Sequence, residues 1–188
     1  MSIRSKNSIN VRKMTYLAIL TALVVVLQAV IAPIIGSASG GVLTPALVLV
    51  PFVLGVAVCG IGAGVWLGGI FAIIVLVSDP SCAPFFAHNL FMTIVLVFAK
   101  GIGAGVLSGL IFKALSKKNK MLAIIIAAIA APVVNTGIFV VGCWLFFIEL
   151  TGVEIYTLFI TANFALELAV NLIFVPSVYK ILQVSQLA

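Results

Sequence analysis

Three polar residues spaced by four, Asn163, Glu167 and Asn171, interrupt an apolar stretch near the end of the chain. On a helix this spacing places the side chains on one face, which drifts by about 40° per step. A carboxylate at the centre of a membrane helix costs about 2.5 to 3.5 kcal/mol on insertion scales, and such residues usually mark solute or proton pathways. We therefore expect Asn163 and Glu167 to contact a small solute, and Asn171 to hold two helices together.

Lys100 is a second charge inside an apolar stretch. Counted from the outer ends of their segments, Lys100 lies about 16 Å and Glu167 about 21 Å deep, so each could reach the other or a shared ligand. A structural ion pair would neutralise both charges without any ligand. Because Asn135, Thr136 and Asn163 share this depth, we favour a solute site that includes Lys100 and Glu167.

The stretch A-A-P-V-V-N-T-G contains Pro132, Asn135 and Thr136. Pro132 cannot donate a backbone hydrogen bond, so a helix should kink there and open a polar notch. Asn135 and Thr136 then either contact the solute or hydrogen-bond across helices. His88 and Asn89 mark the outer mouth of the segment with Lys100 and are further candidate solute contacts, although a solvated His88 is the simpler alternative.

These residues are set in a chain that composition assigns to the membrane. Of 188 residues, 64% are hydrophobic and 7% charged, and the mean hydropathy is +1.42, which excludes an ordinary soluble domain. The three cysteines have no metal-ligand spacing, so no metal site is expected. Motifs of the HExxH or GxSxG kind and paired aspartates are missing, so no catalytic residue and no enzyme activity are expected.

Apolar segments predict an all-α, polytopic membrane protein with six transmembrane helices, at about 14–31, 43–59, 62–77, 89–115, 121–148 and 152–182, within one integral membrane domain spanning 1–188. All Lys and Arg residues except Lys100 then fall on one side, which predicts that both termini are cytoplasmic in the plasma membrane. Because the basic residues cluster at segment ends, they indicate topology, and no nucleic-acid partner is expected.

Small residues recur at helical spacing in two segments. Gly101, Gly105 and Gly109 follow Lys100, and because no strand precedes them, the pattern predicts close helix packing and not dinucleotide binding. Ala18 and Ala22 form a similar pair in the first segment. The small-xxx-small pattern alone favours packing of this pair within the chain.

Four features occur together: six predicted helices in under 200 residues, A-I-L-T-A in the first, a Gly/Ser loop before the second and polar residues in the last three. This combination resembles the substrate-binding S component of an energy-coupling factor (ECF) vitamin transporter. Its closest similarity is to the branch with riboflavin and pantothenate carriers. The resemblance implies that Ala18 and Ala22 contact a transmembrane scaffold subunit, itself bound to two ABC-type ATPases. It also implies that residues 32–42, with Gly36, Gly40 and Gly41, cap the ligand as a lid.

The expected function is therefore capture of a small vitamin at the outer face, with no cofactor in this chain because the partner subunits use the ATP. Lys100 is the one cation at pocket depth, which tilts the expectation toward the acid pantothenate, with riboflavin next. The alternative is a small stand-alone secondary transporter that couples to protons through Glu167. No inverted repeat relates residues 14–77 to 89–182, which disfavours that alternative.

Overall fold

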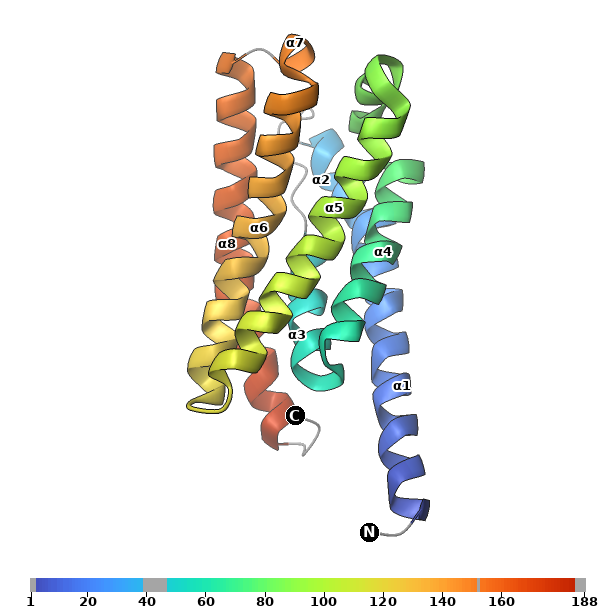
Figure 1. The fold of residues 1–188 in the computed structure, drawn as a ribbon, viewed down its shortest axis with the longest axis vertical. Coiled ribbons are helices and arrows are strands. Elements are labelled where there is room, and N and C mark those ends of the chain that lie inside the picture. The colour runs from blue at the N-terminus through green and yellow to red at the C-terminus, as the bar shows by residue number, and fades with distance from the viewer. Residues whose placement is uncertain (1–2, 39–46, 152, 185–188) are drawn as a thin grey trace.

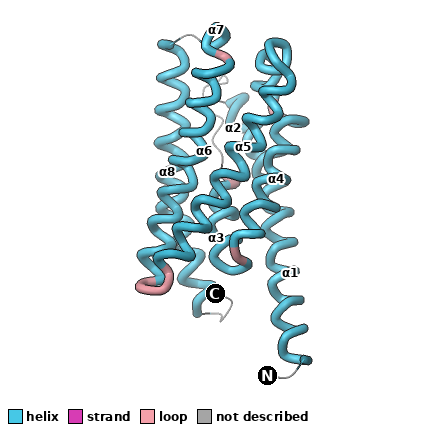
Figure 2. The backbone as a smooth tube through the Cα atoms, viewed as in Figure 1, coloured by secondary structure: helices cyan, strands magenta, loops and turns pink. Residues whose placement is uncertain are grey.

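The computed structural model describes residues 3–38, 47–151 and 153–184, and nearly all of them are helical (Figures 1 and 2). The elements in chain order are α1 (Ile3–Val26), the π-helical turn η1 (Leu27–Ile31), α2 (Ala32–Ala38), α3 (Leu49–Cys59), α4 (Ile61–Ser78), the 3₁₀ turn η2 (Pro80–Cys82), α5 (Ala83–Leu115), α6 (Lys120–Phe146), α7 (Ile148–Thr151) and α8 (Val153–Val184). The all-α fold is confirmed.

Within the described residues, five helical segments are long and apolar enough to cross a membrane, namely Val11–Ala38, Ile61–Ser78, Pro80–Leu115, Lys120–Phe146 and Ala162–Ile181. They fit a multi-pass membrane protein. The second predicted span, 43–59, appears in the described residues only as α3, with 11 residues. A helix of that length covers about 16 Å, roughly half of the hydrocarbon thickness, so α3 does not supply a sixth span by itself.

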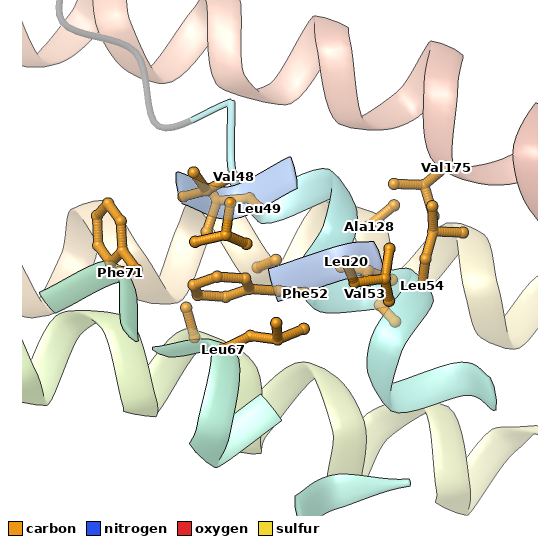
Figure 3. Close-up of a cluster of buried hydrophobic side chains, with 14 of the residues drawn as sticks. Leu20, Val48, Leu49, Phe52, Val53, Leu54, Leu67, Phe71, Ala128 and Val175 are labelled. Carbon is orange, nitrogen blue, oxygen red and sulfur yellow. The ribbon is translucent and has the colours of Figure 1, made fainter. Parts of the chain in front are cut away.

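The helix α3 forms the centre of the hydrophobic core. Eight of its 11 residues are buried. Figure 3 shows its side chains Leu49, Phe52, Val53 and Leu54 among residues contributed by α1, α4, α6 and α8, which are Leu20, Leu67, Phe71, Ala128 and Val175. The rings of Phe52 and Phe71 meet edge to face at 5.8 Å, a favourable aromatic geometry. A short helix enclosed on all sides explains the continuous apolar run in this part of the sequence.

The helices α4 and α5 cross at a row of glycines, as the stripe in the sequence predicted. A Cβ at Gly68 would lie 2.5 Å from the carbonyl oxygen of Gly101, and one at Gly64 would lie 2.6 Å from that of Gly105. Gly109 continues the row against side chains of Val56 and Ile61. Only glycine permits this approach of two backbones, because any side chain would occupy the space of the neighbouring main chain.

Two of the predicted helix limits need correction. The segment with Lys100 begins at Ala83, not at Asn89, because Pro84 lies in the first turn, where its missing N–H breaks no helical bond. Asn89 has non-helical dihedral angles (φ −157°, ψ 98°) and marks a kink inside α5. The first helical segment continues past residue 31 through η1 and α2, and Pro33 cannot donate to the carbonyl of Ala29, which accounts for the wide π turn.

The start of α1, the turn between α5 and α6 and the end of α8 lie at one end of the bundle (Figure 1). The connections from α4 to α5 and from α6 to α8 lie at the other end (Figure 1). The α5–α6 turn is rich in lysine, with Lys113, Lys117, Lys118 and Lys120. Most of the basic residues in the described helices are therefore at the same end.

Candidate functional site

Glu167 lies in the middle of α8 and faces α6. Its side chain is 4% exposed, and the hydroxyl of Thr136 on α6 donates a hydrogen bond to its Oε2 at 3.4 Å. This contact joins two residues that are 31 positions apart, and it confirms that the polar residues of the two segments meet. A buried carboxylate requires such polar neighbours, because burial in an apolar environment penalises its charged form.

Two asparagines flank this contact. Asn135, directly before Thr136, is 5% exposed, and Asn171, one turn after Glu167, is 0% exposed. The Oδ1 atoms of both side chains are buried and have no hydrogen-bond partner. The amide nitrogen of Asn171 donates to the backbone carbonyl of Glu167 at 2.8 Å, a bond within α8 and not the bond between helices that the sequence suggested. Two acceptor atoms thus remain unsatisfied beside a carboxylate.

Asn163 lies one turn before Glu167 on α8, as its spacing predicted, and is partly buried. The polar residues of α8 therefore form a row that begins with Asn163 and ends with the fully buried Asn171. Burial increases along this row, from a partly buried side chain to one with no exposed surface. The acceptors furthest from water lie at the Asn171 end.

Lys100 lies on α5 between two aromatic rings. Its Nζ is 4.7 Å from the ring centroid of Phe139 on α6 and 5.8 Å from that of Phe71 on α4. Both distances are within the range of cation–π attraction, and the ring faces offset part of the desolvation of the ammonium. The described contacts of Lys100 are therefore aromatic, whereas the Glu167 carboxylate is contacted by the Thr136 hydroxyl.

Phe139 connects the two parts of the site, and sequence reasoning missed it. It follows Asn135 by four residues on α6, so both side chains lie on the same helix face. This i, i+4 relation was present in the sequence, but an aromatic residue in a membrane helix carries no functional signal by itself. The site consequently comprises Lys100 over Phe139 at one level of α6, and Asn135, Thr136 and Glu167 at an adjacent level.

Aromatic rings continue from Phe139 toward the end of α5 that bears His88. Phe85 lies 6.0 Å from Phe139 and 5.1 Å from Phe147, measured between ring centroids, and Phe147 lies 5.6 Å from the ring of His88. His88 itself is exposed. The side chain of Asn89 accepts a hydrogen bond from the backbone N–H of Met92 at 3.0 Å, so it caps the helix after the kink.

The residues assigned to coupling and to the lid are placed as follows. Ala18 and Ala22 are both exposed on α1, so the interpretation that they pack within the chain is wrong. Gly36 is buried at the end of the first helical segment. Gly40 and Gly41 lie outside the described residues.

Among the described residues, no group of three or more His, Cys, Asp or Glu side chains could hold a metal ion. Cys82 and Cys143 do not form a disulfide with each other, and Cys59 does not form one with either of them. An apolar groove of about 350 Å³ lies between α5 and α6 and includes Ala99, Gly137 and Phe146. Its lining is almost entirely apolar, so it offers few hydrogen-bonding groups to a polar solute.

Comparison with protein-family models, with curated proteins and with solved structures finds no match to the chain. The resemblance to S components therefore rests on the residues and the layout of the sequence.

Proposed function

We propose that this chain is a membrane-embedded solute-binding subunit, the S component of an ECF-type importer, that captures a small vitamin from outside. The observation that supports this best is that α6 contacts both charges, with Phe139 against Lys100 and Thr136 bonded to Glu167. Ligand sites commonly combine apolar and aromatic walls with a few polar groups that fix orientation. A cation, ring faces and amide acceptors at adjacent levels suit a solute with an acidic end and hydrogen-bond donors.

Pantothenate is the favoured solute, and riboflavin is the next candidate. The rings around Lys100 attract its ammonium but carry no net charge, so the ammonium can still bind a carboxylate. The aromatic series from Phe139 to His88 would line the approach from outside. A flat, neutral vitamin would use these rings and would depend little on Lys100.

The scaffold subunit would bind the exposed small residues of α1. Ala18 and Ala22 carry little bulk on an exposed face, a pattern that permits close approach of a second helix. In this proposal six helices cross the plasma membrane. Both termini would be cytoplasmic, because the ends of α1 and α8 share the lysine-rich end of the bundle. ATP hydrolysis would occur on partner subunits.

The second candidate is a stand-alone proton-coupled secondary transporter, favoured by the buried carboxylate of Glu167 and its contact with Thr136. Two measurements separate the candidates. Calorimetric titration of the purified chain with pantothenate and riboflavin tests binding, and uptake into proteoliposomes tests transport. An S component binds tightly alone and transports only after the scaffold and ATPases are added. Uptake by the chain alone, driven by a pH gradient, would support the second candidate.

A further inference from the structure

We propose that Glu167, Asn171 and Asn135 form a binding site for a monovalent alkali cation, Na⁺, where α8 packs on α6. This site shares Asn135 and Glu167 with the proposed solute site and does not include Lys100. It does not depend on the identity of the solute or on the existence of a scaffold. The argument starts from the hydrogen-bond acceptors that the fold buries in this region.

The site consists of oxygen atoms that can accept but not donate. Asn135 and Asn171 each bury an Oδ1 atom with no hydrogen-bond partner, although nearly all buried polar atoms in proteins are paired. Glu167 precedes Asn171 by one helical turn, its carboxylate is bonded to Thr136, and its side chain is also buried. Carboxylate, amide and hydroxyl oxygens are hard ligands and suit hard cations. Thr136 adds such an oxygen, because a hydroxyl that donates to Glu167 keeps its lone pairs.

Direct contacts tie the members of the site to Glu167. Thr136 reaches its carboxylate, and Asn135 is the residue before Thr136. The amide nitrogen of Asn171 is held by the backbone carbonyl of Glu167 at 2.8 Å, which directs its Oδ1 away from that bond. Ala128, seven residues before Asn135 on α6, is also buried, and its carbonyl lacks the usual helical donor because Pro132 has no N–H.

The charge of the site favours a monovalent ion. One carboxylate and one Na⁺ together are neutral, whereas a divalent ion would leave a net positive charge in an apolar environment, which is costly. Two amide oxygens require partners. A protonated Glu167 has one O–H group and could donate to only one of them. A cation attracts the carboxylate and both amide oxygens at once. Irregular or interrupted backbone near mid-membrane carboxylates is a recurring setting for Na⁺ in transporters.

The test measures the thermal stability of the purified full-length chain in detergent, in NaCl and in choline chloride at equal ionic strength. An ion that binds only the folded chain stabilises it by mass action, so Tm should rise by several degrees in NaCl. Glu167→Gln and Asn171→Leu should each abolish this rise. The matched control is Ser108→Ala, which removes a buried hydroxyl bonded within α5 and should retain the full rise.

Direct binding of ²²Na⁺ to the same preparations is the second readout. It reports binding without relying on a change in Tm. The wild type and Ser108→Ala should bind the isotope, with displacement by unlabelled NaCl, and Asn171→Leu should not. Equal Tm values in NaCl and choline chloride, without isotope binding, would overturn the proposal and assign the acceptors to water or to a protonated Glu167. Retained Na⁺ dependence in both variants would also overturn it.

Discussion

Replacement of Gly105 by alanine should destabilise the chain through the crossing of α4 and α5. The added Cβ would lie 2.7 Å from the carbonyl carbon and 2.8 Å from the Cα of Gly64, whereas carbon atoms pack at about 3.5 to 4.0 Å. Because the opposing atoms belong to the main chain, they cannot rotate aside. The two helices must separate by about 1 Å, which forfeits between a quarter and a half of each dispersion contact along the crossing.

The expected net destabilisation is about 1 to 2 kcal/mol. Overpacking costs about 1 to 3 kcal/mol, and a clash with main-chain atoms belongs in the upper part of that range, about 2 to 3 kcal/mol. The higher helix propensity of alanine returns about 1 kcal/mol. For a chain of this size, that loss lowers Tm by about 2 to 8 °C. Thermal unfolding of the purified protein, followed by tryptophan fluorescence, measures the change.

Gly69→Ala is the matched control, because a Cβ at Gly69 meets nothing within 4 Å. This variant gains helix propensity without a clash and should unfold at the same temperature as the wild type or slightly higher. If Gly105→Ala and Gly69→Ala changed Tm equally, the two backbones would not be in close contact. The reasoning about the crossing would then be refuted.

Three further predictions concern the site, the coupling surface and one helix end. Lys100→Met should weaken pantothenate binding by more than tenfold in calorimetry, since a charge-assisted hydrogen bond contributes about 1.5 to 3 kcal/mol. Glu167→Gln should be better tolerated. Unchanged affinity in Lys100→Met would remove Lys100 from the site. Ala18→Trp should abolish uptake with the scaffold and ATPases but leave vitamin affinity intact, because the residue is exposed; lost affinity would contradict a coupling role. Asn119→Ala should lower the free energy of unfolding by about 0.5 to 2 kcal/mol, because the Asn119 side chain accepts hydrogen bonds from two backbone N–H groups at the start of α6. Thermal unfolding measures the loss, and an unchanged Tm would contradict the capping role.

The sequence predicted those features of the fold that depend on local patterns. Hydropathy located the long helices, and the spacing of Gly101 and Gly105 identified a close crossing, because both signals repeat with the helical period. The structure begins α5 earlier than predicted, because Pro84, whose residue type disrupts a helix interior, also suits a first turn. The short length of α3 depends on how the neighbouring helices enclose it, and no local pattern reports that enclosure.

The partners of the site residues could not be predicted from their expected depth in the membrane. Counting residues along a helix gives depth at 1.5 Å per residue, and it placed Lys100 near Glu167. The rotation of each helix about its axis decides which side chains meet, and packing sets that rotation. In the structure, Lys100 lies over Phe139 and Phe71, and Glu167 contacts Thr136. Depth alone does not distinguish these contacts from a direct pair between Lys100 and Glu167.

The opposite charges of Lys100 and Glu167 lead to a last prediction, which joins the solute site to the cation site. We expect the two charges to balance each other partly when no ligand is bound, because opposite charges attract strongly where the dielectric constant is low. Na⁺ bound at Glu167 would remove that attraction and leave the Lys100 ammonium to the carboxylate of an anionic solute. Binding of the cation should therefore strengthen binding of the acid, and by linkage the acid should strengthen binding of the cation to the same degree.

The measurement is calorimetric titration of the wild type with pantothenate in NaCl and in choline chloride at equal ionic strength. Couplings between sites are typically 5-fold to 150-fold in affinity, and we expect an increase in NaCl within that range. Glu167→Gln should bind pantothenate equally in both salts, because the neutral amide no longer competes for Lys100. Lys100→Met should lose the increase as well, since the charge that Na⁺ releases is missing. An increase of equal size in Lys100→Met would show that Na⁺ acts on the fold and not on the ammonium, and the electrostatic coupling would be refuted.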